Sequence, residues 1–389
     1  MASAAAASRQ RILLRPGSSC ATAAWAVWIV SLVLGTAGLY MYFTQGHVSA
    51  GYGSYVPWGL WVALYFHGIG IAGGAFILAG AAFLMDKPGF HRPAVLRMAI
   101  VLGVAAILPA FLAVWLDLGQ MARAYRIFTS PKFTSMMTFN AWMYGAFLVV
   151  AALCWMLSFF RESAWLRPLI CLGIFLSITI PSQSGAFFGV VEAKSFWHSG
   201  LFPILFLASA FTSGAAMMLV VGYLMGGDES GESDQQVSYT RMAVIKGMLV
   251  YFMLEFAEFS ILIWNLNAHD PSVNLILTGP YWWVFWLVHL VLGGAVPLAM
   301  LFTRSPLAWA AASLLVAVTF VSSRLNALIP GQAVGELKGL QDAFQHERLS
   351  YIYNATAMEY LVGLFLVAAG MTIFYLGLQL EKSFSGRKA

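Results

Sequence analysis

Charged residues are scarce in this chain: Asp, Glu, Lys and Arg make up only 10% of the 389 residues, while 60% are hydrophobic. Soluble domains carry roughly 25% charged residues. A soluble core would not cover so much apolar surface, so the composition excludes a water-soluble globular fold. The long uncharged runs also lack the alternation of barrel strands. Membrane-spanning helices remain, because lipid tolerates no unpaired backbone groups.

Cysteine is scarce as well, with only Cys20, Cys154 and Cys171 and no C-x-x-C pair. A four-cysteine iron–sulfur cluster needs more thiolates than this, so we expect any such cluster to belong to a partner. The net charge of +5 does not indicate nucleic-acid binding, because the basic residues lie in tails and short connections between apolar runs.

Ten segments are long and apolar enough to cross a bilayer, which requires about 20 residues each. They are 24–44, 57–85, 95–117, 138–160, 167–187, 201–224, 240–264, 281–303, 306–328 and 355–380. We therefore predict an all-α polytopic membrane protein with a tail at 1–23, a transmembrane domain at 24–380 and a tail at 381–389. The first span is expected to be a retained anchor rather than a signal peptide, and the acidic 226–239 segment a solvated linker.

The distribution of basic residues predicts the orientation in the membrane. Of the 21 Lys and Arg residues, 14 fall on the side that holds both termini. Lys and Arg are enriched on the cytoplasmic side, so both termini are predicted to be cytoplasmic in a bacterial-type inner membrane. The longer connections then face the periplasm, where a partner is expected to dock.

Ionisable and amide side chains within the spans are candidates for function, because burying them in lipid is costly. Eight candidates fall in the predicted outer half of the membrane: His67, Asp117, Gln183, Glu255, Glu258, His289, Arg324 and Glu359. We expect a shared polar cavity that opens to the outer face, where opposite charges neutralise one another.

Structural readings of the same residues stay open. Asp117 ends a span and could be a solvated interfacial carboxylate. Arg324 could extend to the headgroups. Glu255 and Glu258 lie on one helix face, and we favour Glu258 for function. The small residues of 68–75 could serve close helix packing, although beside His67 they would also admit a flat ligand.

Several motifs, taken in order, resemble the NrfD/PsrC family of integral membrane subunits. They are the glycine-rich run from Tyr55 to Ala75, Trp115-Leu-Asp-Leu-Gly119, Pro181-Ser-Gln-Ser-Gly185, Phe256-Ala-Glu258, Ser323-Arg-Leu325, and Tyr353 with Glu359. Two features depart from the family pattern. Asn354 and Ala355 stand where proline is frequent, and His289 stands where some members carry a carboxylate.

This resemblance implies two four-helix bundles plus an extra helix pair, and a site for menaquinone or ubiquinone near the periplasmic face. It implies no haem or metal in this chain. The implied partner is a periplasmic iron–sulfur subunit, linked to a molybdopterin, hydrogenase or multihaem cytochrome subunit. The chain would thus be the quinone-binding membrane subunit of a respiratory oxidoreductase complex.

Our hypothesis places a quinone ring between the second, third and fifth spans. The predicted quinone-binding residues are Tyr65, His67, Gly70, Asp117, Gln183 and Ser184, with His67 and Asp117 in the catalytic roles. Glu258, Arg324 and Glu359 are predicted to form a proton relay toward the outer face.

Two other functions remain open from the sequence. His67 and His289 start from the same side at similar depth, which allows a bis-histidine haem of the cytochrome b type. A secondary transporter is the second alternative, although no inverted halves are visible.

Overall fold

A computed structural model describes residues 18–160, 163–225, 231–264, 271–335, 337, 339, 346 and 349–386. Ten helical stretches of this part are long and apolar enough to cross a membrane, and it contains no β-strand. The prediction of an all-α polytopic membrane protein is confirmed. Most of the tail at 1–23 and the last three residues of the tail at 381–389 lie outside the described residues.

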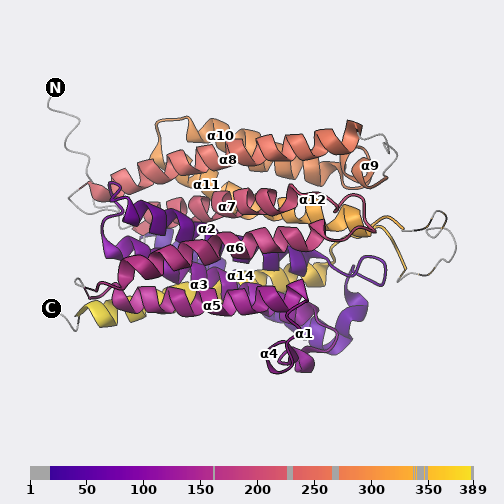
Figure 1. Ribbon diagram of the computed structural model, residues 1–389, viewed down its shortest axis with the longest axis horizontal. Helices are drawn as coiled ribbons and strands as arrows, with labels where there is room; N and C mark the ends of the chain where they lie inside the picture. The colour runs from indigo at the N-terminus through magenta and orange to yellow at the C-terminus, as the bar shows by residue number, and fades with distance from the viewer. Residues whose placement is uncertain are drawn as a thin grey trace.

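The spans form two bundles and a further pair of helices that packs on the first bundle (Figure 1). The first bundle contains α2 (Leu60–Leu84), α3 (Pro93–Asp117), α5 (Met136–Leu157) and α6 (Leu166–Gly189). The second contains α7 (Phe202–Met225), α8 (Glu232–Trp264), the π-helix η4 (Val284–Ala295) continued by α10 (Val296–Leu301), and α11 (Pro306–Thr319) continued by α12 (Val321–Gln332). The pair is α1 (Ser19–Gln45) and α14 (Ala357–Gly386).

The helix α8 begins earlier than hydropathy predicts. Its first residue is Glu232, so 232–239 is helical and is not the linker that we expected, while 226–230 lies outside the described residues. Glu232 and Asp234 occupy the first turn, where negative charge stabilises the positive end of the helix dipole. Glu232 also pairs with Arg92. Polar residues can thus extend a helix beyond its apolar part, where a hydropathy scan does not detect it.

The last two spans of the second bundle are irregular. A π-helix replaces the α-helix around His289. The next span is divided at Phe320, where the hydroxyls of Ser322 and Ser323 donate to the carbonyls three residues before them. Such side-chain bonds compete with the backbone ladder of a helix. Both irregular positions lie beside buried polar side chains.

The two bundles are joined where α2 meets α7. A Cβ atom on Gly74 would lie 2.1 Å from the carbonyl oxygen of Ala210, and one on Gly214 would lie 2.3 Å from the amide nitrogen of Ala75. Glycine at both positions lets the two backbones touch, as small residues do in membrane helix pairs. The helix α2 therefore belongs to the first bundle and also contacts the second.

The helices α1 and α14 run antiparallel. Trp28 donates its indole N–H to Thr372 at 2.9 Å, while Gly35 and Gly38 lie against Phe365 and Leu361. The start of α1 therefore lies beside the end of α14, and both are at the same end of the bundle (Figure 1). The opposite end carries Asp117 and Tyr353, and we call it the pocket end.

We expect Gly74→Ala to destabilise the protein by about 1 to 3 kcal/mol, because the added methyl group would overlap the α7 backbone. Gly363→Ala is the matched control, since its methyl would make ordinary contact with Leu64 at 3.5 Å. Thermal unfolding in detergent measures both. Equal melting temperatures for the two variants would contradict a tight α2–α7 contact.

Candidate functional site

A cavity of about 930 Å³ lies at the pocket end of the first bundle. Its walls come from α2, α3, α5, the last turn of α6 and the 118–135 connection between α3 and α5. Aromatic rings form much of the lining: Trp58, Tyr65, Phe66, Phe111, Trp115, Phe128, Tyr144 and Phe187. Ligand pockets typically enclose roughly 300 to 1,000 Å³ with mostly apolar walls. The cavity has the size and character for a flat, mainly apolar molecule.

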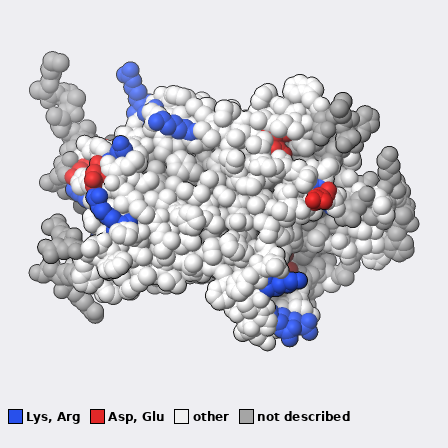
Figure 2. All heavy atoms as spheres, viewed as in Figure 1, with Lys and Arg blue, Asp and Glu red and all other residues white. Residues whose placement is uncertain are grey.

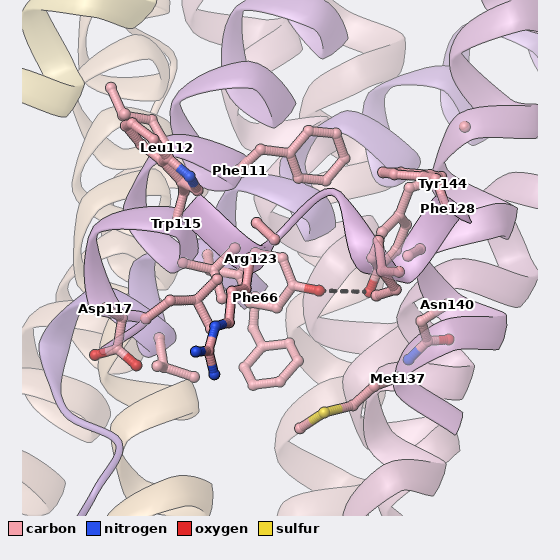
Figure 3. Close-up of a pocket in the computed structure, with 18 of the residues that line it drawn as sticks. Phe66, Phe111, Leu112, Trp115, Asp117, Arg123, Phe128, Met137, Asn140 and Tyr144 are labelled. Carbon is pink, nitrogen blue, oxygen red and sulfur yellow. Dashed lines mark hydrogen bonds between the residues drawn. The ribbon is translucent and has the colours of Figure 1, made fainter. Parts of the chain in front are cut away.

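Two polar atoms of the lining are buried and have no hydrogen-bond partner: Oδ1 of Asp117 and Oδ1 of Asn140. Figure 3 shows these side chains on opposite sides of the view, with Phe66 and Arg123 between them. An unpaired buried polar group costs about 1 to 3 kcal/mol. Two such acceptors in an aromatic pocket fit a ligand that carries a hydroxyl group at each end of a ring.

A chain of hydroxyl groups leads out of the cavity toward α6. Tyr65 donates to the Tyr144 oxygen at 3.2 Å, drawn as a dashed line in Figure 3. The Tyr144 and Ser184 oxygens are 3.1 Å apart, and Ser184 is within 2.8 Å of the Ile180 carbonyl oxygen. Sequence reasoning found Tyr65 and Ser184 but missed Tyr144 and Asn140. Their four-residue spacing on the fourth span, which puts both on one helix face, was the available signal.

Glu359 caps α14 and also fixes the loops beside it. Its Oε2 accepts from the backbone N–H of Thr356 at 2.9 Å and of Gly51 at 2.8 Å, and its Oε1 accepts from the hydroxyl of Tyr353 at 2.5 Å. Thr356 with Glu359 three residues later is the capping-box arrangement. Tyr353 in turn accepts from the N–H of Leu60 at the start of α2. One fully buried carboxylate thus ties the starts of α14 and α2 together.

Tyrosines near this carboxylate report the local electrostatics. Burial, followed by the charge of Glu359, raises the pKa of Tyr353, which therefore stays a hydrogen-bond donor at neutral pH. Burial, followed by the charges of Asp117 and Glu359, raises the pKa of Tyr52. Asp117 and Glu359 thus both lie near Tyr52, and part of the predicted outer-face cluster is brought together.

Arg324 and Glu258 are buried in separate surroundings. The guanidinium of Arg324 lies 4.1 Å from the ring centre of Phe206 and donates from Nη2 to the Phe206 carbonyl at 3.2 Å. It is 3% exposed, so it does not extend to the headgroups. Glu258 accepts from Ser199 at 2.8 Å. Among the described residues, no hydrogen bond or ion pair joins Glu258, Arg324 and Glu359 to one another.

The second bundle contains a buried pair that our sequence analysis did not connect. Nε2 of His289 lies 2.9 and 3.0 Å from the two carboxylate oxygens of Glu255, and Nδ1 lies 3.0 Å from Ser322. Tyr251 donates to Glu255 at 2.8 Å. We had favoured Glu258 over Glu255. The sequence did contain a signal for this pair, because both side chains are ionisable and lie at similar depth on consecutive spans. Pairing lowers the free-energy cost of burying two such groups in lipid.

The remaining predicted ligands do not line the cavity. His67 is buried, and its Nε2 lies 2.7 Å from the carbonyl oxygen of Ala317 in α11, so this nitrogen carries the proton. Gly70 faces Ala210 and Arg324 at the contact between the bundles. Gln183 is also absent from the lining. The structure thus brings Tyr65 and Asp117 to the cavity, and Ser184 to its edge, but separates them from His67 and Gly70.

The capping arrangement predicts different effects for two substitutions of Glu359. Glu359→Gln keeps one acceptor oxygen for the backbone N–H groups but loses the one that accepts from Tyr353, so it should cost about 1 kcal/mol, whereas Glu359→Ala leaves all of these buried donors unpaired and should cost about 2 kcal/mol or more. Thermal unfolding measures both, with Glu192→Ala as an exposed control at the same end. A Gln variant as unstable as the Ala variant would show that the charge, and not the cap, matters.

The sequence matches a known family over most of its length. Residues 48–335 match the profile described as Polysulphide reductase, NrfD. The chain is 27% identical to a selenate reductase subunit of Mesobacillus selenatarsenatis, over 92% of this chain and 93% of that protein. It is 26% identical to an Hdr-like menaquinol oxidoreductase integral membrane subunit of Archaeoglobus fulgidus, over 92% of each chain.

A shorter match, at 22% identity, is to Protein NrfD of Escherichia coli and covers 62% of this chain and 83% of that protein. The motifs noted in the sequence from Tyr55 to Ser323-Arg-Leu325 lie within the matched residues, and Tyr353 and Glu359 follow them. Ten helices long and apolar enough to cross a membrane agree with this assignment. The chain is a multi-pass integral membrane protein that belongs to the NrfD (polysulphide reductase) family.

Proposed function

We propose that this chain is the quinone-binding membrane subunit of a respiratory oxidoreductase complex, and that the cavity of the first bundle is its quinone or quinol site. The observation that carries the proposal is the pair of unpaired buried acceptors, Asp117 Oδ1 and Asn140 Oδ1, within aromatic walls. A quinol is a flat ring with a hydroxyl at each end, so it fits both features. The name of the Archaeoglobus relative, a menaquinol oxidoreductase subunit, supports the same ligand class.

The proposed chemistry balances two electrons and two protons. In the quinol-oxidising direction, the Asp117 carboxylate accepts one hydroxyl proton, and water accepts the second proton after it has passed the hydroxyls of Tyr65 and Tyr144. The two electrons pass to an iron–sulfur cluster of the partner subunit. In the reducing direction every transfer runs backward, with Asp117 protonated at the start.

We place the partner at the pocket end, on the periplasmic side of an inner membrane, with both termini cytoplasmic. The excess of Lys and Arg on the side of the termini supports this orientation. The reductase and oxidoreductase names of the relatives support a partner with catalytic centres, for which we propose an iron–sulfur protein linked to a molybdopterin, hydrogenase or multihaem cytochrome subunit.

The proton relay needs revision in the light of the contacts. Glu359 makes the bonds of a helix cap, so we leave it out of the relay. We instead assign any coupled proton movement to a cluster of four buried groups: Arg324, Tyr251, Glu255 and His289. Tyr251 donates to Glu255, Glu255 pairs with His289, and the charge of Arg324 acts on Tyr251. Glu258 stays a candidate for the exit at the pocket end.

The bis-histidine haem has less support than the quinone site. Nε2 of His67 is bonded to the Ala317 carbonyl, and Nε2 of His289 to Glu255. Both ring nitrogens of His289 are engaged, since Nδ1 also lies 3.0 Å from Ser322, so a haem ligated by this histidine would have to displace one of these partners.

Asp117→Asn should lower quinone-coupled turnover of the assembled complex at least about 100-fold, because the amide cannot accept the proton. Asp86→Asn is the matched control, since that carboxylate is exposed at the opposite end and contacts the exposed Arg167 at 3.5 Å. Turnover is measured with a short-chain quinol, after the subunits are shown to co-purify. Normal turnover in Asp117→Asn would end the assignment of the cavity.

His67 provides a second test, since the sequence predicts a quinone ligand and the structure shows a bond to Ala317. His67→Gln keeps a donor and should retain turnover within a few-fold. His67→Leu leaves the Ala317 carbonyl unpaired and should cost about 1 to 3 kcal/mol of stability. Thermal unfolding and turnover together decide. Loss of turnover in a stable His67→Gln variant would restore His67 as a ligand.

A further inference from the structure

The 118–135 connection between α3 and α5 projects sideways from the pocket end. It contains the short helices η3 (Met121–Arg123) and α4 (Arg126–Thr129). Figure 1 places α4 at the flank of the bundle beside α5, and not beyond the ends of the helices. It directly follows one span and precedes another, so it lies at the depth where the apolar layer of a membrane gives way to headgroups.

The charge of this connection has one sign. Arg123, Arg126 and Lys132 are all exposed, and the sequence from 118 to 160 contains no Asp or Glu. Within the described part of the chain, none of the three cations forms an ion pair. Figure 2 shows the blue side chains gathered on this projection. The cations lie at the end of the molecule that has the fewer Lys and Arg residues, so the topology rule does not account for them.

Large apolar side chains are exposed beside these cations. Tyr125, Phe128 and Phe133 are 58%, 55% and 62% exposed. Phe128 and Phe133 both lie against Trp142 of α5, with ring centres 5.9 and 5.8 Å apart from it. Aromatic rings beside Lys and Arg are typical of segments that lie in a membrane interface.

We propose that the 118–135 connection binds anionic phospholipids: Tyr125, Phe128 and Phe133 enter the edge of the acyl-chain layer, while Arg123, Arg126 and Lys132 bind lipid phosphate groups. A lipid explains the sideways projection and the exposed rings together, whereas an acidic protein partner would explain only the charge. Arg123, Ile127 and Phe128 also line the cavity, so the bound lipid stands at its mouth. The inference does not depend on the identity of the cavity ligand.

The test uses the full chain in nanodiscs of phosphatidylcholine, alone or with phosphatidylglycerol. Hydrogen–deuterium exchange is followed in peptides that cover 118–135. We expect several-fold slower exchange when phosphatidylglycerol is present, with the effect reduced by added salt. Equal exchange in the two lipid compositions would overturn the proposal.

Arg126→Gln/Lys132→Gln should abolish the difference between the two nanodiscs and weaken phosphatidylglycerol binding about tenfold or more by native mass spectrometry. These two residues do not line the cavity. Arg167→Gln/Arg304→Gln removes the same charge from exposed residues at the opposite end and should leave the 118–135 peptides unchanged. If hydrogen–deuterium exchange of the 118–135 peptides in the double variant still slowed when phosphatidylglycerol was present, the assignment would be contradicted. Protection that appears only with added partner subunits, in either lipid, would assign the surface to a protein.

Discussion

Backbone contact between α2 and α7 at Gly74 and Gly214 fixes one helix against both bundles, and the positions of the functional side chains follow from it. With the backbones touching, α2 cannot rotate without a clash. Tyr65 and Phe66 then face the cavity, while His67 reaches α11 in the second bundle. Neighbouring residues on this helix therefore belong to two different polar regions, which are separated by the helix itself.

Lipid requires that each buried charge find its partner inside the protein, and this chain meets the requirement with several small clusters. Glu359 accepts hydrogen bonds from two loops and a tyrosine, Glu255 lies against a histidine, and Arg324 donates to a carbonyl and lies over an aromatic ring, although its Nε has no partner among the described residues. We had expected one shared cavity for all of these charges. Separate local contacts can stabilise these charges as one shared cavity would, because a buried charge needs only a few directed hydrogen bonds. Adjacent helix ends supply those bonds.

Hydropathy predicted the ten spans because burial in lipid is decided by long averages, which are insensitive to the direction of a single side chain. The site was predicted only in part, because contact with a ligand depends on the direction of single side chains. Tyr65 and His67 are two residues apart, and a difference of about 200° around the helix decides which of them meets a ligand. No single-sequence pattern fixes that rotation when the whole helix is apolar.

The capping role of Glu359 was legible in Thr356-x-x-Glu359, but its place within an apolar span led to the prediction of a relay group instead. Asn140 and Tyr144 were overlooked because neither is ionised at neutral pH, and the search for functional side chains within the spans centred on charged groups and histidines. The 232–239 segment was assigned by its polarity, although its acidic first turn also suits a helix start.

The π-helix from Val284 to Ala295 has a consequence for comparing this chain with its relatives. Such a stretch arises when one extra residue is accommodated in an α-helix without disturbing either end. Removing that residue would let the helix rewind and turn everything on one side of it by about 100°. His289 lies in this stretch with Nε2 2.9 Å from Glu255, so a relative that is one residue shorter just before this position would present a different side chain toward the carboxylate.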